Sequence, residues 1–139
     1  MGKHFRLSTI LLIVYCGFLF YLSSVPGNSL PHLNFPDTGI HYFLYLGLGL
    51  VFAFFLYNLK FDLFWMKTGT ATFFFMAIFG LGDEIHQMFV VGRDFSPRDL
   101  LMDVVGGISG WLLFIFLYTY LGKLREIRIS ELLLKNRDN

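Results

Sequence analysis

Four stretches of about 20 mostly apolar residues constrain this chain more than any other feature of its sequence. They span residues 7–25, 37–59, 68–91 and 99–121. The hydrocarbon core of a bilayer is about 30 Å thick, and an α-helix needs about 20 residues to cross it. Charged residues make up 15% of the 139 residues, against about 25% in soluble domains. The sequence therefore predicts an all-α, polytopic membrane protein with four transmembrane helices.

The distribution of lysine and arginine predicts the orientation, because short loops rich in these residues stay in the cytoplasm. Nine of the 11 Lys and Arg residues lie at the N-terminus, in the loop between the second and third stretches, or after residue 121. The loop at 26–36 carries none, and the loop at 92–98 carries Arg93 and Arg98. We therefore expect a multi-pass protein of the cell membrane with both termini cytoplasmic.

No repeat or linker divides the chain. We expect one transmembrane domain at residues 1–121 and a basic cytoplasmic tail at residues 122–139. We expect the tail to form a cytoplasmic helix near the membrane surface. Its apolar positions form no clean stripe, so its expected role is to fix the topology. The net charge of +1 argues against a nucleic-acid partner, which requires a strong basic excess. The expected partner is the lipid bilayer.

Polar residues gather at the outer ends of the last three apolar stretches. On one side of each helix these are Asp37, His41 and Tyr45; Asp83, Glu84, His86 and Gln87; and Asp99 and Asp103. By the predicted orientation, all three groups occupy the same level of the membrane. An ionisable residue inside a bilayer costs a few kcal/mol unless it faces a partner or a wet cavity. We therefore expect these side chains to meet in one outward-facing pocket.

Small residues favour the same arrangement. Gly106 and Gly110 form a GxxxG motif in the fourth stretch. Such spacing lets the backbones of two membrane helices approach closely. This close approach would bring the polar groups of neighbouring helices together.

The pocket has two possible roles on this evidence. Buried carboxyl groups and imidazoles can transfer protons, so His41, Asp83 and Glu84 are candidate catalytic residues. The candidate binding residues are Asp37, Gln87, Arg93, Asp99 and Asp103. Alternatively, the same polar network fixes how the helices pack, and the protein is not an enzyme.

Arg93 also has two possible roles. Its guanidinium group offers a planar pair of donors that suits a phosphate or carboxylate. It could equally neutralise the nearby acids Asp83, Glu84, Asp94 or Asp99.

Metal and serine chemistry receive less support. The acids and histidines offer N and O ligands, but the chain has no HExxH motif and no Cys/His ligand spacing. The sequence therefore predicts no metal site, and it identifies no cofactor. Ser23 and Ser24 lack a surrounding G-x-S-x-G motif, so we expect ordinary helix-end serines.

Three segments together resemble the VanZ-like membrane proteins: FYLSSVPGNSLP, PDTGIHYFLYLGLGL and GDEIHQMFVVGRDFSPRDLLMDVVGGISG. They occur in the same order, from about residue 18 to about residue 113. The most specific part is D-E-x-x-Q, then G-R, then D-x-x-x-[DN]-x-x-G. Thr38 and Val91 depart from the pattern, since the family often carries Lys and Pro there. The missing lysine removes a potential anion contact beside Asp37.

The resemblance implies an integral membrane protein. For the name-giving members it also implies a link to resistance against the glycopeptide antibiotic teicoplanin. Our leading hypothesis is a pocket that binds or acts on an anionic cell-envelope molecule, a phospholipid or an isoprenoid-linked sugar. The alternative is a non-catalytic membrane component whose acids and arginines serve packing and assembly. A transport role would require an oligomer, because four helices leave little room for a pathway.

Overall fold

The computed structural model describes residues 2–29, 37–59 and 65–135. Every regular element in these ranges is helical, as the sequence predicts. The elements are α1 (Lys3–Ser23), the short 3₁₀ helix η1 (Gly27–Ser29), α2 (Asp37–Asn58), α3 (Trp65–Gln87) and α4 (Pro97–Lys135).

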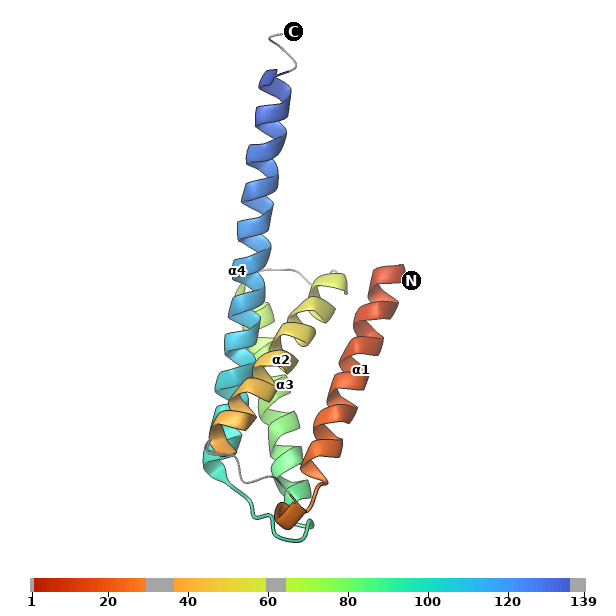
Figure 1. Ribbon diagram of the computed structural model, residues 1–139, viewed down its shortest axis with the longest axis vertical. Helices are drawn as coiled ribbons and strands as arrows, with labels where there is room; N and C mark the ends of the chain where they lie inside the picture. Colours follow the sequence, from red (N-terminus) through yellow and green to blue (C-terminus); the bar gives the residue numbers. More distant parts are fainter. Residues whose placement is uncertain (1, 30–36, 60–64, 136–139) are drawn as a thin grey trace.

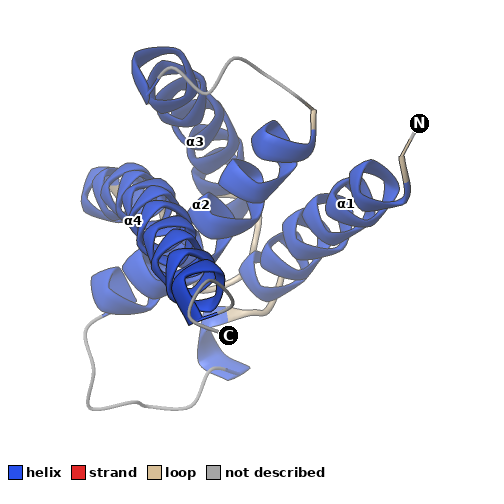
Figure 2. Ribbon diagram, turned by 90° about the horizontal axis from the view of Figure 1, so that it is seen from above, coloured by secondary structure: helices blue, strands red, loops and turns tan. Residues whose placement is uncertain are grey.

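The four long helices alternate in direction along the chain (Figure 1). The start of α1 and the end of α4 therefore point to the same side of the bundle. The segments that follow α1 and α3 meet at the opposite end, which we call the loop end. Viewed from above, α2 lies between α1 and α4 (Figure 2). It contacts all three other long helices, and its most extensive contact is with α4.

Three helices are long and apolar enough to cross a membrane: α1, α2 from Thr38 onward, and α4 as far as Glu126. The third predicted span corresponds to α3, which does not reach the same level of hydropathy. Its threonines and its acids Asp83 and Glu84 lower its average. A membrane crossing by α3 therefore stays a prediction.

Most helix boundaries differ from the predicted ones by a few residues, and the ends of α3 and α4 matter most for the site and the tail. The third stretch was expected to continue to residue 91, but α3 ends at Gln87 and a turn follows. The fourth helix continues through residue 121 without a break and reaches 39 residues. The first part of the basic tail is thus an extension of α4.

Close backbone contacts hold α2 against α4. A Cβ atom added at Gly106 would meet the carbonyl oxygen of Tyr42, and one added at Gly110 would meet that of Leu46. Only a residue without a side chain allows this approach, which is how small residues drive helix association in membranes. The GxxxG motif therefore lies at the α2–α4 interface.

Apolar and aromatic side chains fill the space between α1, α2 and α3. The buried cluster consists of Leu19, Tyr45, Leu48, Phe52, Leu56 and Met76. The ring of Phe52 stacks on that of Phe75 with centroids 4.1 Å apart. This core lies next to the polar residues at the loop end.

A glycine at the loop end positions the segment after α3. Gly92 has a φ of +76°, a conformation that glycine adopts at low cost. The carbonyl group of the preceding residue, Val91, accepts a hydrogen bond of 3.1 Å from Gly27 N. These contacts bring the side chain of Arg93 next to the end of α1.

Candidate functional site

A buried histidine–aspartate pair joins α2 to α4. His41 Nδ1 lies 2.9 Å from Asp103 Oδ1, and the exposed fractions of the two residues are 9% and 0%. On the other side of Asp103, a Cβ atom added at Gly80 would lie 3.0 Å from Asp103 Oδ2. The glycine thus lets α3 approach the same carboxylate, and three helices meet at Asp103.

Glu84 links α3 to the first turn of α4. The backbone N–H of Ser96 donates a 2.7 Å hydrogen bond to Glu84 Oε2. Ser96 Oγ in turn accepts a bond of 3.3 Å from Asp99 N, so Ser96 acts as the N-cap of α4. In an ordinary capping box the residue at the third helical position bonds the N-cap N–H. Here Glu84 takes that role, and the Asp99 side chain is left for other contacts.

His41, Glu84 and Asp99 form a compact cluster although they come from three helices. Each offers one nitrogen or oxygen atom, and these atoms all lie within 4.8 Å of one another. The positive end of the α4 helix dipole lies beside the two carboxylates and favours their negative charge.

Several buried oxygen atoms at this end of the bundle have no hydrogen-bond partner within the described protein. They are Tyr45 Oη, Asp83 Oδ1, Glu84 Oε1, Asp99 Oδ1 and Asp103 Oδ2. A buried polar atom without a partner costs about 1–3 kcal/mol, and such atoms are uncommon in native proteins. Their concentration at one place marks this end of the bundle as the candidate functional site.

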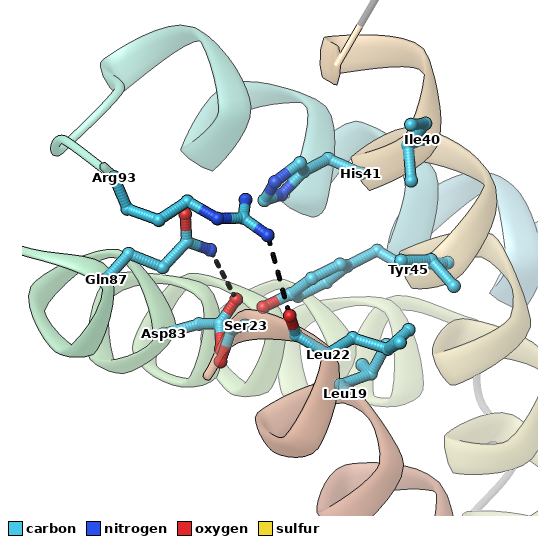
Figure 3. A pocket seen from close by; sticks show the side chains of 10 residues that line it. Leu19, Leu22, Ser23, Ile40, His41, Tyr45, Asp83, Gln87 and Arg93 are labelled. Carbon is cyan, nitrogen blue, oxygen red and sulfur yellow. Dashed lines mark hydrogen bonds between the residues drawn. The ribbon is translucent and has the colours of Figure 1, made fainter. Parts of the chain in front are cut away.

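A cavity of about 120 Å³ opens beside the cluster (Figure 3). Its apolar wall includes Leu19, Leu22, Ile40 and Leu44, and its other lining residues are Ser23, His41, Tyr45, Asp83, Gln87 and Arg93. A water molecule takes up about 30 Å³ in the liquid, and pockets for drug-sized ligands measure about 300–1,000 Å³. The cavity therefore has room for a group the size of a phosphate, while a whole lipid must remain largely outside.

The guanidinium group of Arg93 extends into this cavity toward His41 (Figure 3). Its Nε donates to the carbonyl of Val25 at 3.3 Å, and Nη2 to that of Leu22 at 3.5 Å. A guanidinium has five N–H donors, so these two bonds orient the group and leave other donors available. Among the side chains that the structure describes, none of the acids forms an ion pair with Arg93.

Asp83 and Gln87 occupy successive turns of α3 and face the cavity together. Gln87 Nε2 donates a 3.2 Å hydrogen bond to Asp83 Oδ2, and both residues are buried. The amide thus satisfies one carboxylate oxygen.

The structure brings seven of the eight predicted site residues to one end of the bundle. They are His41, Asp83, Glu84, Gln87, Arg93, Asp99 and Asp103. Asp37, the eighth, begins α2, but its side chain lies outside the part of the chain that the structure describes.

His86, which shares the polar side of α3, faces a different neighbour. Its ring stacks on Phe20 with centroids 4.3 Å apart, and Nε2 lies 3.0 Å from Ser24 Oγ. The Ser24 hydroxyl donates to the carbonyl of Phe20 at 2.7 Å, so its single proton is already used. The pair therefore fastens α1 to α3.

Two contributions were not predicted from the sequence: the capping role of Ser96 and the bonds from Arg93 to α1. The sequence SPRD at residues 96–99 carries the signal for the cap, since serine followed by proline is typical of a helix start. No sequence signal indicates the Arg93 contacts, because they depend on how the segment after α3 folds back onto α1.

A larger cavity of about 260 Å³ lies toward the opposite end of the bundle, between α2, α3 and α4. Its lining is aromatic, aliphatic and hydroxyl-bearing, with no charged side chain. Trp111 Nε1 donates to Thr68 Oγ1 beside it at 3.1 Å. Among the described residues, the buried acids and His41 thus lie at the loop end, which makes the smaller cavity the candidate functional site.

Comparison with known proteins agrees with the resemblance. A sequence profile of the VanZ/LLP1 family matches residues 8–118, a range that contains every residue of the candidate site. Searches of the curated proteins and of the solved structures found no match to this chain. Because the family profile covers most of its length, the chain belongs to the VanZ/LLP1 family.

Proposed function

We propose that the protein crosses the cell membrane four times, with both termini in the cytoplasm and the loop end outside. The 23 residues of α3 correspond to a helix of about 35 Å at 1.5 Å per residue, long enough to cross the apolar core. The antiparallel packing of α3 in the bundle (Figure 1) and the excess of Lys and Arg at the other end support this topology.

In this orientation, the site at the loop end binds an anionic group of a cell-envelope lipid or lipid-linked sugar. The observation that carries this proposal is Arg93, whose guanidinium enters a cavity with an apolar wall and forms no ion pair with the acids whose side chains the structure describes. Charge-assisted hydrogen bonds from arginine suit phosphate oxygens. The apolar wall at Leu19 and Leu22 suits the first methylene groups of a lipid chain.

The neighbouring groups can also transfer protons to or from the bound molecule. The Asp103 carboxylate accepts a hydrogen bond from the Nδ1–H group of neutral His41, and this tautomer has a lone pair on Nε2. Asp83 Oδ1 and Glu84 Oε1 have no partner in the described protein. This arrangement supports His41 as a proton acceptor, with Asp83 and Glu84 as acids or bases.

A second candidate function is purely structural, and one observation favours it. Glu84 bonds the N-cap of α4, and Arg93 bonds the last carbonyls of α1. Each of these polar residues therefore also holds one helix to another. In this reading the site serves packing and assembly, and the protein binds no envelope molecule specifically.

Lipid binding to the purified protein distinguishes the two. Native mass spectrometry would compare retention of an isoprenyl phosphate and phosphatidylglycerol with that of diacylglycerol, which lacks phosphate. Arg98 offers a matched control, since it is an exposed arginine in the first turn of α4, close to Arg93 in the sequence. Because hydrogen bonds to charged groups contribute about 1.5–3 kcal/mol, Arg93→Gln should weaken binding of the phosphate lipids at least about 10-fold.

The Arg98→Gln variant should bind like the original protein, and Arg93→Lys should fall in between because lysine keeps the charge but not the planar fork. Equal retention of the three lipids, or equal binding by the Arg93→Gln and Arg98→Gln variants, would leave the structural role as the better account. Growth of a deletion strain in teicoplanin would test the family's link to antibiotic resistance separately.

A further inference from the structure

The charges at the loop end do not balance. Four carboxylates, Asp83, Glu84, Asp99 and Asp103, gather around one arginine and one histidine. Glu84 and Asp103 are 0% exposed. Buried carboxylates are costly unless they are paired or bind a metal ion. A bound cation would offset this excess of acidic groups among the described side chains.

We propose that His41, Glu84 and Asp99 together bind a divalent transition-metal ion of the Mn²⁺ or Zn²⁺ class, with Asp103 orienting His41 from behind. This goes beyond the proposed lipid binding and does not depend on it. While the ion is bound, His41 and Glu84 act as its ligands and not in proton transfer. The sequence predicts no metal site, because known metal-binding motifs have their ligands at fixed spacings within one segment of the chain. Here one ligand comes from each of three helices.

The first argument is the geometry of the three donors. Their atoms lie within 4.8 Å of one another. A tetrahedral ion at about 2.1 Å from each ligand requires ligand atoms roughly 3.4 Å apart. The ligand atoms therefore need to approach one another by up to about 1.4 Å around the ion, which small changes in side-chain torsion angles provide.

The second argument is that each of the two acids has an oxygen atom available. Glu84 Oε1 and Asp99 Oδ1 are buried and have no hydrogen-bond partner within the described residues. Glu84 is held in place through its other oxygen, Oε2, by Ser96 N. The carboxylate is thus fixed by one oxygen and free at the other, as a metal ligand is in many proteins.

The third argument is the contact between His41 and Asp103. A histidine that binds a metal through one nitrogen almost always donates its other N–H to a carboxylate or carbonyl group. Asp103 Oδ1 lies 2.9 Å from His41 Nδ1, which leaves Nε2 as the ligand. Asp103 is a positioning residue in this arrangement, since it acts on the ion through His41.

The mixture of one imidazole and two carboxylates sets the class of ion. Imidazole favours zinc, iron and related metals, while carboxylates also suit manganese and magnesium. Three protein ligands leave at least one coordination position open for water or for an oxygen of a bound anion. A phosphate held by Arg93 in the adjacent cavity is well placed to supply that oxygen.

The test measures metal directly on the full-length protein in mild detergent, purified without a histidine tag. After removal of metal with a chelator, the protein is dialysed against Mn²⁺ or Zn²⁺, and the retained metal is determined by elemental analysis. We expect about one ion per chain, because a complete ligand set gives a defined stoichiometry. The ion should also raise the thermal unfolding midpoint, since it binds the folded state.

Four variants decide whether the proposed residues hold the ion. Glu84→Gln and Asp99→Asn keep the size of each side chain, and glutamine can still accept the Ser96 N–H bond. Both should bind metal at least about 10-fold more weakly, and Asp103→Asn about 10- to 100-fold more weakly. Asp94→Asn is the control, because Asp94 is an exposed acid between α3 and α4. This variant should bind metal like the original protein.

Two results would overturn the proposal. One is that the original protein retains no more metal than a chelator-washed sample and shows no shift in unfolding. The other is that the Glu84→Gln and Asp99→Asn variants bind as tightly as the Asp94→Asn control. Lipid binding is measured separately, so a failure of metal binding does not count against the role of Arg93.

Discussion

A close backbone contact between α2 and α4 gives a quantitative prediction for Gly110→Ala. A Cβ atom at this position would meet Leu46 O, and it would lie 2.8 Å from Leu50 N. Both are backbone atoms of α2, so no side chain can move aside to make room. The whole of α2 must shift away from α4, and the site between them shifts with it.

Gly82→Ala serves as the matched control for the size of the effect. Gly82 lies inside α3 and is exposed, and an added Cβ would meet nothing within 4 Å. Replacing glycine by alanine within a helix stabilises it by about 0.5–1 kcal/mol, and this gain applies to both variants. Overpacking costs about 1–3 kcal/mol and applies to Gly110→Ala alone. The difference in unfolding free energy between the variants should therefore be about 1–3 kcal/mol.

Unfolding of the two purified variants in the same detergent, followed by circular dichroism, measures this difference. The Gly82→Ala variant should be at least as stable as the original protein, and the Gly110→Ala variant clearly less stable than Gly82→Ala. If the two variants unfold together, the backbones of α2 and α4 are not in contact at Gly110, and the reasoning is refuted.

Two further predictions concern the packing and the topology. Trp111→Phe removes the hydrogen bond to Thr68 and should lower the free energy of unfolding by about 0.5–1.5 kcal/mol in the same assay; an unchanged stability would contradict this. For topology, single cysteines at Ser29 and Lys123, both exposed, would be introduced after replacing Cys16 by alanine. A membrane-impermeant maleimide should label position 29 in intact cells and position 123 only after lysis; the reverse pattern would contradict the orientation.

The position of the site could be predicted from the sequence because two independent regularities agree. Helical periodicity places His41, Glu84 and Asp103 each on the polar face of its own helix. The cost of a charge in lipid turns those faces inward. The glycines at 106 and 110 indicate that a close contact exists. These arguments give the depth of each residue and its side of the helix.

Periodicity along one helix does not identify the neighbour that each face meets. His86 shares the polar side of α3, yet it packs on Phe20 of α1. The contacts of Arg93 with α1 depend on the turn at Gly92, which no repeating pattern encodes. A boundary near residue 121 was predicted because hydropathy ends there. The helix instead continues unbroken into the tail, whose leucine, lysine, arginine and glutamate residues are good helix formers.

The central claim is that polar residues from separate helices meet in one buried site, and a double-mutant cycle on His41 and Asp103 tests it most directly. His41→Ala, Asp103→Ala and the double variant would be unfolded under identical conditions. The 2.9 Å contact predicts a coupling energy of about 0.5–3 kcal/mol, whereas His41→Ala combined with Asp94→Asn should show none. Strictly additive effects of the His41 and Asp103 substitutions would contradict the account, because the two side chains would then not meet.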